Sequence, residues 1–221
     1  MWLSNSSVGR KVVMSVTGIA LVLFLTFHMA MNLVALVSAN GYNMVCEFLG
    51  ANWYALVATV GLAALFIIHI IYGCGLTWQN VKARGGYKRY EASSVAAADS
   101  WSAKNMFVLG IIILGILAFH LTHFWAKMQL AMFTGAEEGN PYELLNLTFG
   151  RWWVLALYLV WFVAVWFHLC HGFWSMFQTV GWNNQTWFKR LKVIGIVVAT
   201  LIFLGFAAVG INAFLQANAL I

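Results

Sequence analysis

The sequence predicts an all-α integral membrane protein with five transmembrane helices. Of its 221 residues, 63% are hydrophobic and only 8% are charged, and the mean hydropathy is +0.84. A soluble domain carries about 25% charged residues, so this chain cannot cover itself with a water-exposed surface. Asp, Glu, Lys and Arg are absent from five stretches. Each stretch can hold the roughly 20 apolar residues that a membrane helix needs.

We expect one transmembrane domain, 1–221, because a chain of this length leaves room for one compact domain. Strands of a membrane barrel would be shorter and would alternate apolar with polar residues, which these stretches do not. The first apolar stretch has about 26 residues, too many for the hydrophobic core of a typical signal peptide. We therefore expect it to be a helix of the mature protein. The predicted helices lie near 12–37, 53–78, 105–128, 152–178 and 193–216.

Basic residues predict that the N-terminus is cytoplasmic. Five spans place the termini on opposite sides, and Trp residues lie near the span ends, as interfacial side chains do. With the N-terminus inside, the outer segments carry only Lys127 and Arg151. This bias follows the positive-inside rule. The inner segments carry Arg10, Lys11, Lys82, Arg84, Lys88, Arg89, Lys104, Lys189, Arg190 and Lys192.

Several classes of protein are excluded by missing patterns. Three cysteines without a CxxC pair do not suit a disulfide framework, a zinc finger or covalent c-type haem. The sequence has no dinucleotide-binding glycine fingerprint, no P-loop and no nucleophile elbow. No carboxylate lies inside a predicted span, so a proton or cation transporter would lack its usual relay.

All six histidines lie inside the predicted spans, where ionisable residues are functional candidates. His28 follows Lys11 by 17 residues, and His120 follows Lys104 by 16. At about 1.5 Å per residue, both lie about 25 Å from the inner boundary. The same arithmetic places the other two, His69 and His168, about 25 Å from the outer boundary. The two levels should therefore be roughly 10–20 Å apart.

Two levels with two facing histidines each predict two bis-histidine b haems. We expect His28 and His120 to bind the outer haem, His69 and His168 to bind the inner haem, and the fifth helix to pack outside these four. Bis-histidine ligation leaves no open position on iron, which favours electron transfer. An HxxH spacing places two rings on nearly one helix face. A shift of one turn, to His123 and His171, therefore stays open.

Residues near the inner level are expected to contact the porphyrin. Gly73 and Gly172 follow the proposed inner ligands by one turn and would leave a flat surface for porphyrin beside the helix. The alternative is that they pack against neighbouring helices, as small residues do in membranes. Buried propionates need donors. The candidates are Ser15, Trp101, His171 and Gln178, with Arg10 and Lys11 at similar depth.

The order of these motifs resembles a known family. The motifs are Phe27-His28 with Asn32, His69 with Gly73, Phe119-His120, and Phe167-His168 with Gly172. Over essentially the whole chain they resemble the cytochrome b membrane-anchor subunit of succinate dehydrogenase/fumarate reductase, in its single-chain, five-helix, di-haem form. One position departs from the family: some relatives carry Glu two residues before the fourth ligand as part of a proton route, and this chain has Trp166.

The resemblance implies a function and partners. It implies two b haems, a menaquinone pool, an iron–sulfur subunit, and through it a flavoprotein that carries FAD and the dicarboxylate site. It also implies the bacterial cytoplasmic (inner) membrane and a possible dimer of the complex. The inner loop 79–104 and the segment through Lys11 are expected to dock the iron–sulfur subunit. Two alternatives stay open: a haem-b anchor of a hydrogenase or formate dehydrogenase type, and a transporter with a histidine-lined pore.

A quinone site should lie at a membrane boundary beside a haem. A second haem near the outer face is useless if quinone reacts only inside, so we expect the outer boundary, with the inner one as the alternative. The outer candidates are His123, Trp125, Asn32 and Glu47. The inner candidates are Ser15, Trp101 and His171.

Overall fold

The computed structural model describes residues 6–50, 52–83, 101–136, 139–182 and 184–220. Within these ranges every regular element is a helix, and no strand is present. Five helical segments are long and apolar enough to cross a membrane. The predicted all-helical class with five long apolar helices is therefore confirmed, and these helices are compatible with a multi-pass membrane protein. The five segments are Ser7–Leu36, Trp53–Ala83, Met106–Thr134, Trp152–Thr179 and Gln185–Ala217.

The helices begin at capping residues rather than at the first apolar residue. Helix α2 (Ser7–Leu33) starts after Ser6, whose hydroxyl accepts from the Gly9 N–H at 2.8 Å, and it runs into a short 3-10 turn, η1 (Val34–Leu36). Helix α10 (Gln185–Ala217) starts after Asn184, whose side chain accepts from the Trp187 N–H at 2.9 Å. The predicted start near 193 was therefore too late, because a side-chain cap satisfies backbone donors before the apolar stretch begins.

The third span changes its helical geometry partway. Helix α6 (Met106–His120) follows the short α5 (Trp101–Lys104) and ends at His120. It continues as a π-helix, η2 (Leu121–Leu130), and then as α7 (Ala131–Thr134). The other two spans are α4 (Trp53–Ala83) and α9 (Trp152–Thr179), close to their predicted bounds.

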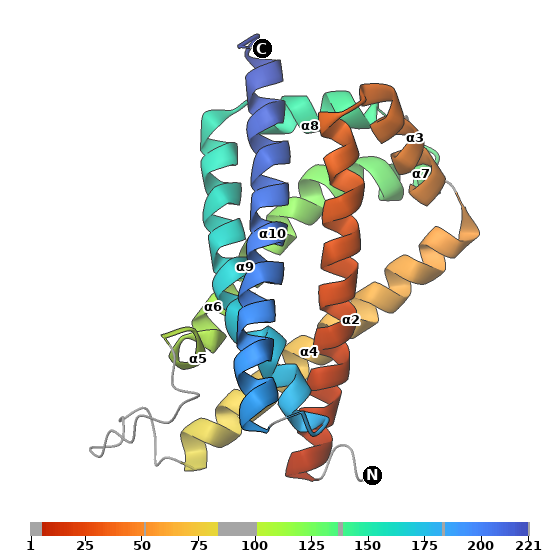
Figure 1. The fold of residues 1–221 in the computed structure, drawn as a ribbon. Helices are drawn as coiled ribbons and strands as arrows, with labels where there is room; N and C mark the ends of the chain where they lie inside the picture. The colour runs from red at the N-terminus through yellow and green to blue at the C-terminus, as the bar shows by residue number, and fades with distance from the viewer. Residues whose placement is uncertain (1–5, 51, 84–100, 137–138, 183, 221) are drawn as a thin grey trace.

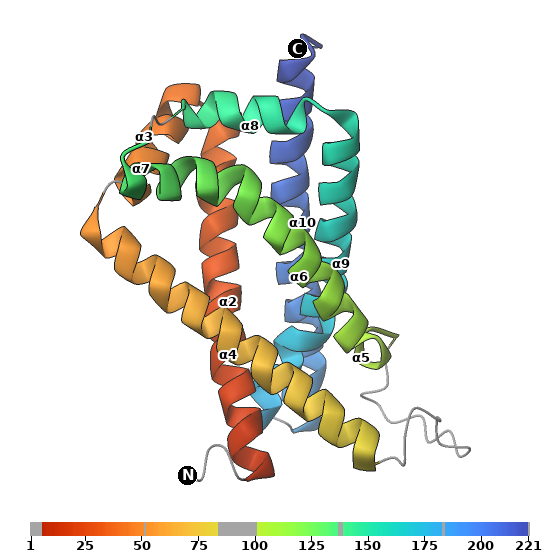
Figure 2. The same cartoon turned by 180° about the vertical axis from the view of Figure 1, so that it is seen from behind.

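The five spans form two groups. Helices α2, α9 and α10 run side by side. Helices α4 and α6 both lie on one side of this row and cross it obliquely (Figures 1 and 2). Helix α10 packs through small residues: Gly205 lies against Met29 of α2, and Gly195 lies against Phe173 of α9. Small residues allow such close approach between membrane helices. Helix α10 thus lies on the face of the bundle away from α4 and α6. It is nevertheless closely packed, since Ala213 is fully buried and Ile202 is 2% exposed.

Short helices cover the end of the bundle where the C-terminus lies, which we call the C-end; the opposite end is the N-end (Figure 1). They are α3 (Ala39–Gly50) and α8 (Pro141–Phe149). Asn43 of α3 accepts from the Tyr142 N–H at 2.9 Å, which ties α3 to α8. The sequence analysis did not predict these helices, although Asn140 before Pro141 is a recognisable helix start.

Gly150 should be intolerant of a side chain. It closes the corner between α8 and α9, and a Cβ there would lie 2.8 Å from the Cβ of Ala217 and 3.0 Å from the Asn146 carbonyl oxygen. Neither atom is the end of a flexible side chain. We expect Gly150→Ala to lower the free energy of unfolding by about 1–3 kcal/mol, as overpacking does. Thermal unfolding in detergent, followed by circular dichroism, measures this.

The matched control is Gly110→Ala, because a Cβ at Gly110 would have no described atom within 4 Å. Alanine also favours a helix over glycine, so this control should keep or raise the Tm. Equal melting temperatures for Gly150→Ala and the unmodified chain would show that the corner is not closely packed.

Candidate functional site

Four histidine rings from four helices lie in two pairs. His28 of α2 and His120 of α6 have ring centroids 6.0 Å apart and planes at 85°. His69 of α4 and His168 of α9 have centroids 6.5 Å apart and planes at 59°. We call these the C-end pair (His28 and His120) and the N-end pair (His69 and His168). Each pair joins two helices that are not consecutive spans.

Helix α2 gives the separation of the two levels. Thr17 of α2 lies 3.0 Å from the Nδ1 atom of His69, so it marks the N-end level. His28, on the same helix, belongs to the C-end pair. The two positions are 11 residues apart by number, which corresponds to about 16 Å along a helix. This value lies inside the range that the depth of the histidines predicts.

The spacing within each pair suits one metal ion between two rings. Two imidazoles on opposite sides of a metal, each with its nitrogen about 2 Å from it, have centroids about 6–6.5 Å apart. No hydrogen bond within the described ranges engages the Nε2 atom of any of the four rings. A haem iron needs only two ligands from the protein, because porphyrin supplies the equatorial ones. The two pairs therefore fit two haems.

A zinc site would need a larger cluster of protein ligands than one pair of rings. Among the residues that the structure describes, no group of three or more His, Cys, Asp or Glu side chains could hold an ion. Sites for zinc usually take three or four such ligands.

Aromatic side chains surround the C-end pair. The His28 ring stacks on Phe24 at 5.4 Å and lies 5.7 Å from Phe206 of α10. The His120 ring lies 5.5 Å from Trp161, and its Nδ1 atom is 3.4 Å from the hydroxyl of Tyr158. The fifth helix thus contributes to this environment through Phe206, which the sequence analysis did not foresee.

Small and flexible residues surround the N-end pair. A Cβ at Gly18 would lie 3.9 Å from the His69 ring. A Cβ at Gly73 would lie 3.8 Å from Met14, and one at Gly172 would lie 3.5 Å from Met106. The space beside both predicted glycines is therefore bounded by methionines, whose flexible side chains adapt readily to a neighbouring group.

The second residue of the first HxxH motif does not share the environment of the first. His120 is the last residue of α6, and His123 lies in the π-helix. A π-helix turns less per residue than an α-helix, so three residues no longer return to the same face. The His123 Nδ1 instead lies 2.9 Å from the Phe119 carbonyl oxygen, and its ring packs on Phe119. The two rings of this motif therefore have different neighbours, and the helix type changes between them.

His171, the second residue of the other HxxH motif, lies 4.9 Å from the ring of Trp174. Its Nδ1 atom is buried and has no hydrogen-bond partner in the described part of the chain, and the same is true of the Nδ1 of His168. Each of these rings therefore keeps a nitrogen for which the described residues supply no partner.

The predicted propionate donors are spread around the N-end pair. Ser15 is 3% exposed, the Trp101 ring lies 5.0 Å from Phe167, and Gln178 lies near the end of α9. Within the described ranges, no hydrogen bond or ring contact joins two of Ser15, Trp101, His171 and Gln178.

The predicted outer quinone residues make separate contacts. Asn32 donates to the His28 carbonyl oxygen at 2.8 Å, and Trp125 donates to Gln129 at 2.8 Å. Glu47 lines an open groove of about 300 Å³ with Met44, Phe48 and Asn52. No hydrogen bond or ring contact among the described residues joins two of the four candidates. The local geometry explains this: Asn32 and Trp125 bond within their own helices.

A polar chain at the C-end was missed by the sequence analysis. The Tyr42 hydroxyl lies 3.4 Å from the Asn32 side-chain oxygen, and Cys46 is its other polar neighbour. Burial raises the pKa of Cys46 to about 11, although the hydrogen bond with Tyr42 opposes this shift. Burial, and then proximity to Cys46, also raise the pKa of Tyr42. Both groups are therefore protonated at neutral pH and link α3 to the carbonyl of His28 through Asn32.

Trp166, which departs from the resembling family, faces the fifth helix. Its indole N–H donates to the hydroxyl of Thr200 of α10 at 3.0 Å. This side chain therefore forms a hydrogen bond between α9 and α10, at the position where some members of the resembling family carry Glu.

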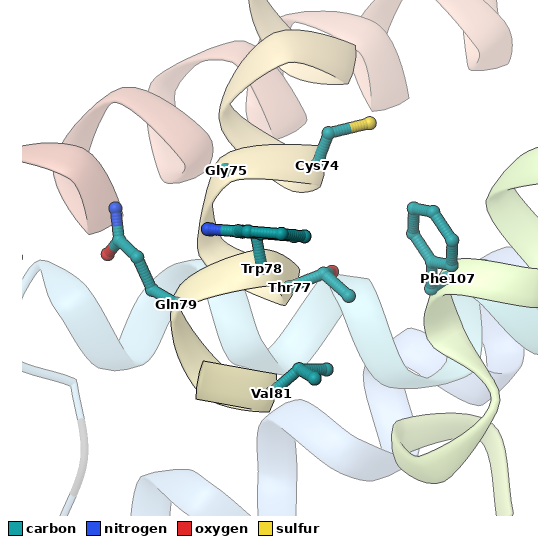
Figure 3. Close-up of a pocket in the computed structure, with 7 residues that line it drawn as sticks. All are labelled: Cys74, Gly75, Thr77, Trp78, Gln79, Val81 and Phe107. Carbon is teal, nitrogen blue, oxygen red and sulfur yellow. The ribbon is translucent and has the colours of Figure 1, made fainter. Parts of the chain in front are cut away.

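A groove of about 470 Å³ lies near the N-end between α4 and α6. Phe107 of α6 lies across from Thr77 and Trp78 of α4 (Figure 3). Cys74, Gly75, Gln79 and Val81 complete the lining. None of the residues predicted to contact haem or quinone is among them.

The chain matches no protein-family model, no curated protein and no solved structure. The functional assignment therefore rests on the residues and their geometry.

Proposed function

We propose that the chain is the di-haem b membrane anchor of a succinate:menaquinone oxidoreductase/fumarate reductase. In this role it passes electrons between an iron–sulfur subunit and menaquinone. The observation that supports the proposal most directly is the pairing of the rings, His28 with His120 and His69 with His168, at centroid distances of 6.0 and 6.5 Å. The order of the motifs, one ligand on each of the first four spans, supports the family.

Each ligand would have a defined part in binding. Haem, when bound, supplies one-electron chemistry at its iron. The four imidazoles would hold the two haems, and their Nε2 atoms have no hydrogen-bond partner among the described residues. The aromatic shell around His120, which includes Trp161 and Phe124, lowers access of water to the C-end pair. Soluble partners would carry FAD, the iron–sulfur clusters and the dicarboxylate site.

The test is the absorbance of the purified full chain. A reduced-minus-oxidised spectrum should show b-type bands, and pyridine haemochrome analysis should give two haems per chain. Identifying the subunits that co-purify then separates this family from a hydrogenase or formate dehydrogenase anchor. If the natively expressed chain lacks b-type bands, the electron-transfer proposal fails and a histidine-lined transporter becomes the better explanation.

The docking surface for the iron–sulfur subunit should lie at the N-end. We propose a cytoplasmic N-terminus and a bacterial inner membrane, because the basic residues gather at this end. Residues 84–100 of the predicted docking loop lie outside the described residues, whereas Lys82 and Lys104 flank them. Crosslinking of the intact complex should join Lys11, Lys82 or Lys104 to the soluble subunits. Crosslinks from Lys127 instead would show that the chain has the opposite orientation in the membrane.

A further inference from the structure

Thr17 of α2 makes three polar contacts through one hydroxyl. The side chain is 4% exposed. Its Oγ1 donates to the Val13 carbonyl oxygen at 2.8 Å and also approaches the Met14 carbonyl oxygen at 3.2 Å. The same oxygen lies 3.0 Å from Nδ1 of His69 on α4. This last contact joins two helices whose positions in the chain are 52 residues apart.

Counting protons fixes the direction of the contact with His69. A threonine hydroxyl has one proton, and backbone carbonyls can only accept. The proton of Thr17 points to the Val13 and Met14 carbonyls, as in the common bond from a helical threonine to the preceding turn. With its proton directed to these carbonyls, the oxygen accepts from His69, and Nδ1 of His69 carries the proton.

We propose that Thr17 is a positioning residue that fixes His69 in the tautomer protonated at Nδ1, so that the Nε2 lone pair is open to a metal. The tautomer follows from the hydrogen bonds alone, whereas its use for haem binding rests on the proposed function. The His69 ring also lies beside Gly18 of α2, where a Cβ would be 3.9 Å from its Cε1 atom.

The other three paired rings lack such a constraint among the described residues. The Tyr158 hydroxyl is 3.4 Å from Nδ1 of His120, and its single proton has no second acceptor in the described chain, so Tyr158 can donate or accept. Nδ1 of His168 has no partner there. A ligand that donates from its second nitrogen becomes more basic. His69 is thus the ligand that the protein holds ready for a metal.

The direct test is the ¹⁵N NMR spectrum of the full chain, produced without haem, in detergent micelles. The His69 signals are assigned by their loss in His69→Ala. Nδ1 of His69 should give a protonated signal and Nε2 an unprotonated one. Thr17→Val should remove this preference, and Thr17→Ser should keep it. An Nε2-protonated His69 in the unmodified chain, or an unchanged His69 spectrum in Thr17→Val, would overturn the proposal.

The matched control is Thr26→Val on the same helix. Thr26 donates to the Val22 carbonyl oxygen at 2.8 Å in the same way, but it is exposed and bonds to no described histidine. This variant should leave the His69 signals unchanged. It therefore separates loss of the Thr17 acceptor from loss of a helical threonine.

Haem-loaded protein gives the second measurement. Thr17→Val should weaken haem binding at the N-end pair about 10–100-fold, as loss of a partner to a metal-binding histidine does. It should also raise the midpoint potential of that haem and leave the other unchanged, because a less basic ligand favours ferric iron less. If the unmodified chain binds no haem, the proposed function fails, while the NMR result still decides the tautomer.

Discussion

Replacing His28 or His120 with alanine should reduce the bound haem from two per chain to one. The rings of this C-end pair lie 6.0 Å apart, a spacing at which two imidazoles can share one metal. His69→Ala and His168→Ala should likewise remove one haem each. The levels are about 16 Å apart along α2, so loss at one level should leave the ligands of the other in place. Pyridine haemochrome analysis of the purified variants measures the ratio.

The controls are His123→Ala and His171→Ala. These residues keep the HxxH spacing, but neither ring contacts a ring of the two pairs. Both variants should therefore keep two haems. If His123→Ala loses a haem and His120→Ala keeps both, then His123, one turn further along the helix, is the ligand in place of His120. Spectra of the four single-haem variants should also fall into two classes, one for each pair.

The pairing of the histidines could be predicted from the sequence because a helix has a fixed rise. Positions counted from residues at the span ends place His28 level with His120, and His69 level with His168. No knowledge of side-chain contacts was needed, since antiparallel spans of equal length convert residue number into depth. The apolar stretches predicted the five spans for the same reason.

Local hydrogen bonding set the features that the sequence analysis missed. The caps at Ser6 and Asn184 begin α2 and α10 among polar residues, where hydropathy gives no signal. The π-helix after His120 changes the face on which His123 lies, and nothing in the apolar pattern marks that change. The acceptor role of Thr17 depends on a contact with a residue of another helix. Predicting it requires knowledge of how α2 and α4 cross.

The quinone candidates show the limit of arguments from depth alone. Residues at one depth can face different directions and make different contacts. Asn32 bonds the His28 carbonyl, whereas Glu47 lines an exposed groove on α3. Depth therefore selects a level in the membrane, and the helical faces decide which residues at that level can meet a common ligand.

His123→Ala should lower menaquinol-linked electron transfer about 100-fold without loss of haem. The Phe119 carbonyl can only accept, so Nδ1 of His123 donates to it at 2.9 Å. In the neutral ring, Nε2 is then an acceptor, which suits the hydroxyl of a quinol better than the carbonyl of a quinone. A base placed to take that proton contributes about 10²–10⁴-fold to a rate. The measurement is the turnover of the intact complex with a menaquinol analogue.

Glu47→Gln should have a smaller effect than His123→Ala, because Glu47 lines a separate open groove and no described contact joins it to His123. His171→Ala is the matched control, since His171 occupies the corresponding HxxH position on α9, towards the N-end. Turnover should be unchanged in this variant if the quinol reacts at the C-end. Normal turnover in His123→Ala together with a large loss in His171→Ala would place the site at the N-end instead. The haem content of each variant separates loss of a quinol-binding group from loss of an electron carrier.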